Sequence, residues 1–269
     1  MFGFGAKRPL SADEWEWQLA AFKWLDETVG AGEPRQPLVT PTVDYFPTGA
    51  STGAVRAAEL LEQVQNAAAM AQADWPVRLV FAGDELPHHV PVAQGVALYN
   101  PGQGVAGTFQ TETLDDGGWR AVITLSPVQL ETEMGAIATL AHELAHYLLA
   151  TVERPMPGGE DCHELLTDLT AVYLGFGIFM GNSARFGSHQ FDEGGQWYQS
   201  GWQGYLSERA LMTALAIQET LAGRDPLAAC QWLKPHLAQD VKLAARYLAR
   251  RDLAADMAAI DLADYGAAA

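Results

Sequence analysis

Apolar residues recur at spacings of three and four along the middle of the chain, which is the pattern of a helix with one buried face. The pattern runs through Ile137, Leu140, Leu144 and Leu148. An earlier helix is predicted from the capping box at Ser11 and Glu14. Further helices are expected over residues 52–72, 205–221, 226–237 and 240–257, and from Ser126 onward.

Between the early helices and this central one, the periodicity changes to short runs rich in β-branched and aromatic residues, separated by turn residues. Four strands are therefore expected, at residues 77–81, 95–99, 107–111 and 120–125. The order predicts an α+β fold in which a small mixed β-sheet is followed by a mostly helical half. We expect a single domain of 269 residues, with a sheet-containing lobe of about 1–125 and a helical lobe of about 126–269.

The net charge of the chain limits the kinds of molecule that it can bind. The chain holds 33 acidic and 16 basic residues, a net charge of −17, which repels phosphate backbones and anionic lipid surfaces. We therefore expect neither nucleic-acid nor membrane binding. The longest apolar run, Leu169 to Met180, is shorter than the roughly 20 residues that span a bilayer, and predicts a buried core helix. An N-terminus without an apolar segment and only two cysteines predict a cytoplasmic protein without disulfides.

The central helix carries the motif His142-Glu143-Leu144-Ala145-His146. Two imidazoles four residues apart on a helix lie one above the other on the same face, so both can bind one metal ion. Glu143 is rotated by about 100° from His142, beside the metal without binding it. There a carboxylate can accept a proton from metal-bound water. The pattern predicts two zinc ligands and a general base.

A catalytic zinc site needs a third protein ligand and keeps its fourth position for water. A second helix is expected from Glu160, after the turn at residues 154–159, and it places Glu164 and Asp168 on one face. Asp168 has the chemistry to accept the second N–H of a metal-bound imidazole. Cys162 and His163 lie within one turn of Glu164 and are competing candidates for the third ligand.

The HExxH motif followed by Glu164 and Asp168 in an ExxxD pattern resembles the gluzincin branch of the zincin metallopeptidases, over about 35 residues from Thr139 to Tyr173. The resemblance implies a zincin-like fold with an active-site helix and a second ligand helix. It makes Glu164 the third zinc ligand and Asp168 the partner of His142. It also implies that an edge strand, residues 107–111 or 120–125, pairs with extended substrate.

A hydrolase of this kind needs a donor for the oxyanion of the transition state, and zincins usually supply a Tyr or His from a downstream segment. The candidates are His189, Tyr198 and Tyr205, of which we favour Tyr205.

Two further motifs indicate other classes of protein. Residues 102–107 match GxGxxG, but β-prone residues follow where a dinucleotide site requires a helix, so a hairpin turn is expected. Residues 49–53 match GxSxG, but no buried strand leads directly into Ser51, and the cap of the next helix explains the same residues. A serine hydrolase using Ser51 is the less favoured alternative.

The sequence thus predicts a zinc-dependent metallopeptidase. Its expected ligands are His142, His146 and Glu164, with Glu143 as base and Tyr205 as the second catalytic residue, and its substrate is a peptide or protein. The alternative from another class is a zinc-stabilised binding module without catalysis. Glu143 argues against it, since a structural zinc site is closed by a fourth protein ligand and has no use for a base.

Overall fold

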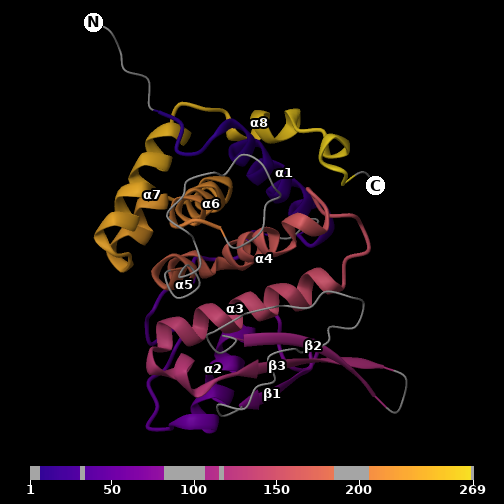
Figure 1. The fold of residues 1–269 in the computed structure, drawn as a ribbon. Coiled ribbons are helices and arrows are strands. Elements are labelled where there is room, and N and C mark those ends of the chain that lie inside the picture. The colour runs from indigo at the N-terminus through magenta and orange to yellow at the C-terminus, as the bar shows by residue number, and fades with distance from the viewer. Residues whose placement is uncertain (1–6, 31–33, 82–106, 115–117, 185–205, 268–269) are drawn as a thin grey trace, which may run out of the picture. The chain divides into compact units, whose positions relative to one another are not determined.

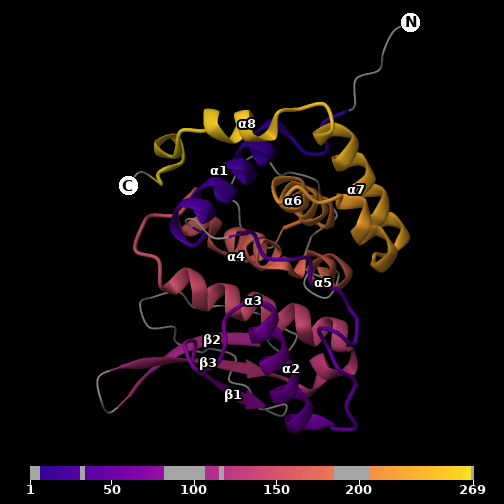
Figure 2. The same ribbon diagram turned by 180° about the vertical axis from the view of Figure 1, so that it is seen from behind.

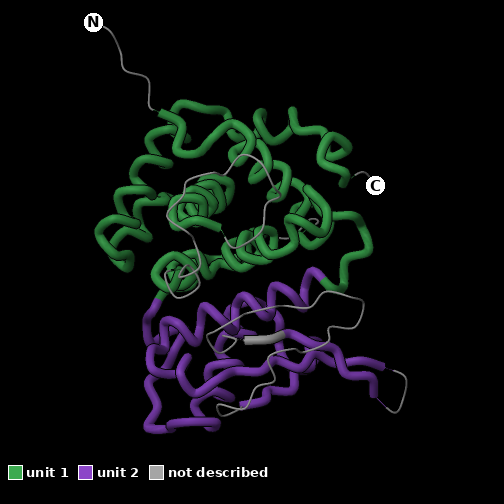
Figure 3. Tube along the Cα trace, viewed as in Figure 1, with its two compact units in different colours: residues 1–40, 150–269 green, residues 41–149 purple. Residues whose placement is uncertain are grey.

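The computed structural model describes residues 7–30, 34–81, 107–114, 118–184 and 206–267. The fold is α+β, with helices and one small sheet of mixed strand direction, as the sequence predicted. The chain divides into two compact units (Figure 3). Residues 41–149 form the sheet unit, and residues 1–40 together with 150–269 form the helical unit.

The sheet has three strands among the described residues, in the order β1-β3-β2. β1 (Val77–Phe81) runs parallel to β3 (Trp119–Leu125), and β2 (Gly107–Thr113) runs antiparallel to it. Three of the predicted strands are confirmed, and the fourth, residues 95–99, lies outside the described residues, as does most of the predicted 102–107 turn. β3 is the central strand, so it is excluded as the edge strand.

Helix α3 (Glu133–Ala150) lies along the sheet in both ribbon views (Figures 1 and 2). Its contact with the sheet is aromatic. The Tyr147 ring packs against Phe109 of β2, Trp119 of β3 and Trp75 at centroid distances of 5.9, 5.2 and 5.0 Å. Aromatic pairs of this geometry stabilise a core beyond the area that they bury.

The start of α3 is fixed to α2 (Gly53–Ala67) by a buried charge. The Arg56 guanidinium, 7% exposed, donates to Glu133 at 2.8 Å and to Glu59 at 3.2 Å. A buried cation needs such partners. The helix expected from Ser126 is a short 3-10 helix, η1 (Pro127–Glu131), with the predicted capping box. The chain then extends at Thr132, so α3 begins separately at Glu133.

The helical unit begins with α1 (Ala12–Thr28), whose Ser11–Glu14 capping box confirms the prediction. The single helix expected from Glu160 is a series of shorter elements. They are η2 (Glu160–Cys162), α4 (His163–Ala171), a π-helical turn η3 (Val172–Phe176) and α5 (Gly177–Ser183).

The last helices differ from the expected ranges. They are α6 (Glu208–Leu221), the 3-10 helix η5 (Pro226–Trp232), α7 (Pro235–Leu248), α8 (Leu253–Ala259) and the 3-10 helix η6 (Leu262–Tyr265). Pro235 suits the first turn of a helix and starts α7 inside the range expected to be one helix. The Asp252 side chain accepts from Ala255 N–H and starts α8, so the predicted 240–257 helix is two helices.

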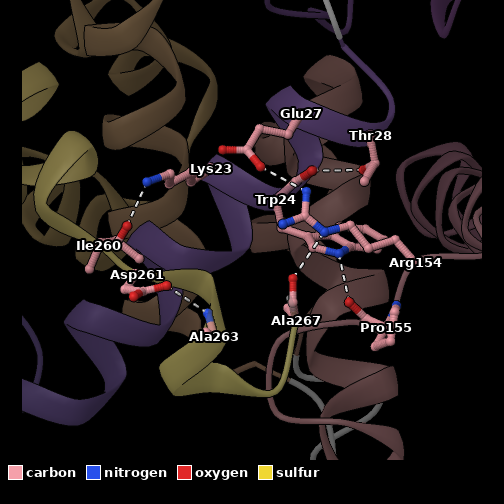
Figure 4. A network of polar contacts seen from close by, with 10 residues as sticks. All are labelled: Lys23, Trp24, Glu27, Thr28, Arg154, Pro155, Ile260, Asp261, Ala263 and Ala267. Carbon is pink, nitrogen blue, oxygen red and sulfur yellow. Dashed lines mark hydrogen bonds and ion pairs between the residues drawn. The ribbon is translucent and has the colours of Figure 1, made fainter. Parts of the chain in front are cut away.

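The C-terminal segment is held against α1 and against the turn that follows α3 (Figure 4). Lys23 donates to the Ile260 carbonyl, and Arg154 donates to the Ala267 carbonyl and to Glu27. Trp24 of α1 donates to the Pro155 carbonyl. The turn between α3 and α4 is therefore fixed by hydrogen bonds from both ends of the chain.

The apolar stretch Glu160–Ser183 is long and apolar enough to cross a membrane, but 94% of its most apolar window is buried inside the structure. Leu169, Phe176 and Phe179 are fully buried. This is the buried core helix that the sequence predicted.

Gly175 is the residue of η3 at which the helix is kinked between α4 and α5. Its φ is +100°, and its carbonyl accepts from Val39 N–H at 3.0 Å. A Cβ at this position would lie 2.3 Å from the Pro37 carbonyl oxygen, so both the backbone conformation and the space require glycine.

We predict that Gly175→Ala destabilises the protein by the strain of positive φ, about 1–2 kcal/mol, plus a steric cost of about 1–3 kcal/mol. Gly223→Ala is the matched control, because Gly223 also has positive φ (+69°) but open space around its Cβ position. Urea denaturation compares the two variants. Equal losses of stability would show that the contact with Pro37 contributes nothing.

Candidate metal centre

The two motif histidines face each other on α3. Their Nε2 atoms are 3.1 Å apart, and the rings are nearly perpendicular, with centroids 4.7 Å apart. Two Nε2 atoms at this distance either share one hydrogen or direct both lone pairs at a common cation. Two nitrogens bound tetrahedrally to zinc would be about 3.4 Å apart. The observed pair fits such an ion with little movement.

The buried apolar residues on one face of α3 set the position of the two histidines. Leu140, Ala141, Leu144 and Ala145 are fully buried, which fixes the rotation of α3 and thus the face that carries the histidines. His146 and Glu143 are themselves only 8% and 5% exposed. Buried imidazole and carboxylate groups of this kind require polar or metal partners.

A side chain of the sheet also packs against His146. The Phe109 ring of β2 lies 6.2 Å from the His146 ring at an interplanar angle of 15°, and it packs on Tyr147 as well. Burial raises the pKa of the Tyr147 hydroxyl, consistent with an apolar environment beside the second histidine. Phe109 was not identified from the sequence, because its contact depends on which face of β2 turns toward α3.

One ligand atom from each of His142, His146 and Glu164 lies within 4.8 Å of the others. Within the part of the chain that the structure describes, this is the one group of three or more His, Cys, Asp or Glu side chains with the spacing of a metal site. The donor set, two imidazoles and a carboxylate, suits zinc. The three residues of this group are those predicted from the sequence as zinc ligands, and that they bind zinc stays a prediction.

The competing ligands are placed differently. The Cys162 sulfur, 4% exposed, lies beside Gly158, where an added Cβ would be 2.4 Å from it. Burial, and to a smaller extent the charge of Asp161, raises the pKa of this thiol. His163 is about one-third exposed, and its Nδ1 is 3.8 Å from Glu164 Oε1. Neither belongs to the group of convergent ligand atoms.

Asp168 is 3% exposed, one turn after Glu164 on α4. Its Oδ2 accepts from the Leu206 backbone N–H at 2.9 Å. This contact joins residues 38 positions apart, and nothing in the local sequence indicates it. The predicted contact of Asp168 with His142 stays a prediction. Tyr205, His189 and Tyr198 lie outside the described residues.

The Ser51 hydroxyl, the nucleophile of the less favoured alternative, donates to the Glu59 carboxylate, which also pairs with Arg56. A serine nucleophile needs a base that takes its proton, most often a histidine. Ser51 instead belongs to the ion-pair network at the start of α2.

Comparisons with protein-family models, curated proteins and solved structures found no match. The chemistry of the centre is therefore argued from its own residues.

We predict that the purified protein binds one zinc ion per chain. His142→Ala, His146→Ala and Glu164→Ala should each reduce the bound zinc, because each removes one of three convergent donors. His236→Ala is the matched control, an exposed histidine paired with Glu208. Elemental analysis after dialysis gives the stoichiometry. Full zinc in both motif-histidine variants would contradict the prediction, and full zinc in Glu164→Ala alone would move the third ligand to Cys162 or His163.

Proposed function

We propose that the protein is a zinc-dependent hydrolase of the metallopeptidase kind, with His142, His146 and Glu164 as zinc ligands. The observation that carries the proposal is the pair of convergent Nε2 atoms with a glutamate next to the first of them in sequence. Three protein ligands would leave one position for water, as in a catalytic site and unlike a closed structural site. The resemblance to gluzincins supports the same ligand set.

When bound, zinc lowers the pKa of water and polarises a carbonyl oxygen. Glu143 is the residue of this chain that moves the proton. Its carboxylate accepts a proton from the attacking water and can deliver it to the leaving amine, so that no net proton is gained or lost by the protein. Its burial excludes bulk water, which would otherwise compete for that proton.

The sheet supports a peptide as substrate. β2 is an edge strand of the described sheet, and its Phe109 contacts the second motif histidine. An extended peptide that pairs with β2 by β-addition would run beside the motif face of α3. Of the two strands considered from the sequence, β2 is the one that lies at an edge of the sheet formed by the described strands.

We predict that Glu143→Gln abolishes peptide hydrolysis, with zinc content and fold unchanged, because the amide has the same shape but cannot accept the water proton. Glu131→Gln, an exposed glutamate of η1 in the same unit, is the matched control and should retain full activity. Cleavage of a diverse peptide library by wild type and both variants measures the effect. A chelator should inactivate the wild type, and a serine-directed fluorophosphonate should not.

Unchanged turnover in Glu143→Gln would refute the general-base role. Stoichiometric zinc without any cleavage by the wild type would favour the non-catalytic zinc module. Inactivation by the fluorophosphonate would favour the alternative of a serine hydrolase that uses Ser51.

We further propose that Asp168 positions a zinc ligand, His142. Asp168→Ala should weaken zinc affinity by about 10- to 100-fold without removing a ligand. Asp168→Asn keeps an oxygen that can accept from Leu206 N–H but removes the charge, so it should fold normally and still bind zinc more weakly. Glu160→Ala, which removes an exposed carboxylate just before α4, is the control.

Competition against a chelating dye measures these affinities, and thermal unfolding of the metal-free proteins reports the fold. An Asp168→Asn affinity within about twofold of wild type would limit Asp168 to its contact with Leu206.

A further inference from the structure

A second concave site lies wholly within the helical unit. It is a pocket of about 380 Å³, within the size range of small-molecule sites. Three segments line it: α1 through Asp13, Glu16 and Trp17, the turn before α4 through Gly158, Asp161 and Cys162, and η6 through Tyr265.

Hydrogen bonds hold the three walls together. The Trp17 indole N–H donates to the Pro157 carbonyl at 3.0 Å, and Gly158 N–H donates to the Tyr265 carbonyl at 2.9 Å. Gly158 has a φ of +88°, and a Cβ there would also lie 3.3 Å from Trp17 Nε1. The pocket is therefore built by close approach of the turn to α1, and it does not depend on a single loop.

The rim of the pocket is acidic. Asp13, Glu16 and Asp161 are exposed, and none of them forms an ion pair or hydrogen bond with a residue that the structure describes. No Lys or Arg lines the pocket. The pKa of Tyr265 is raised by burial first and then by the charges of Glu16, Asp264 and Asp13. The negative potential of these carboxylates therefore reaches the wall of the pocket.

The inner part of the pocket is formed by buried, polarisable side chains. Trp17 and Cys162 are both 4% exposed. The Cys162 thiol lines the pocket, and no described residue is its hydrogen-bond partner. An indole ring and a thiol offer an apolar, polarisable surface, and aromatic faces also attract cations. Trp17 and Cys162 therefore supply the buried apolar part of the lining, beside the three exposed carboxylates.

The spacing of the acidic groups decides whether the pocket suits a metal ion or a larger organic cation. Among the described residues, only His142, His146 and Glu164 converge closely enough to hold a metal ion, so Asp13, Glu16, Asp161 and Cys162 do not form a metal site. Carboxylates spread around a rim suit a larger cation. We propose that this pocket binds a small organic cation, with an ammonium or guanidinium group at the acidic rim and an alkyl chain against Trp17 and Cys162.

Isothermal titration calorimetry with agmatine tests the proposal, because this probe carries a guanidinium and an ammonium joined by a short alkyl chain. We expect saturable binding of one agmatine per chain, and none of succinate or 1,4-butanediol, which have similar length without positive charge. The double variant Glu16→Gln/Asp161→Asn should bind at least about tenfold more weakly. Circular dichroism checks that it folds.

Glu62→Gln/Glu131→Gln is the matched control. Both glutamates are exposed in the sheet unit and have no partner among the described residues, so this variant loses the same charge elsewhere. Its agmatine affinity should stay within about twofold of wild type. His142→Ala should also bind agmatine normally, because the pocket contains no proposed zinc ligand. Absence of saturable binding to the wild type, or equal weakening in both double variants, would overturn the proposal.

Discussion

The convergence of two imidazole nitrogens on one face of α3 is the constraint on which the candidate centre depends. Helical geometry alone brings residues four apart onto one face, but it does not decide whether that face is turned toward solvent or toward the core. The buried stripe on the opposite side of α3 decides it, together with the aromatic packing of Tyr147 and Phe109. The result is a 3.1 Å separation between the two Nε2 atoms, close to the separation that zinc imposes.

Other contacts fix α4, the helix that carries Glu164 and Asp168. α4 follows a turn fixed by Arg154, Trp17 and Trp24, and it continues into a π-helical turn at Gly175. π-helical turns change the register of the residues that follow, and they often occur near functional sites. Asp168 is buried on this helix and holds Leu206, so the helix also organises the start of the chain segment that leads into α6. These tertiary contacts fix the position of the short helix α4 within the helical unit.

Local patterns predicted the elements that carry the centre, but not the contacts that connect distant segments. The capping box at Ser11, the strand at residues 77–81 and the buried helical stripe of α3 are local features, and the structure confirms each of them. The grouping of His142, His146 and Glu164 followed from the ExxxD resemblance. The packing of Phe109 on His146 and the hydrogen bond from Leu206 to Asp168 depend on strand register and on tertiary packing, and no short-range signal encodes either. Helix ends were wrong where a proline or an aspartate starts a new helix, at Pro235 and Asp252.

X-ray absorption spectroscopy at the zinc edge of the purified protein tests the central claim most directly, because it identifies the atoms around the ion without depending on activity. The proposal predicts zinc with two imidazole nitrogens and oxygen donors at about 2.0–2.2 Å, and no sulfur neighbour. It also predicts that the imidazole signal is lost in a His142→Ala/His146→Ala double variant. A sulfur neighbour at about 2.3 Å would assign Cys162 in place of Glu164. A spectrum without imidazole would contradict the claim that α3 holds the metal.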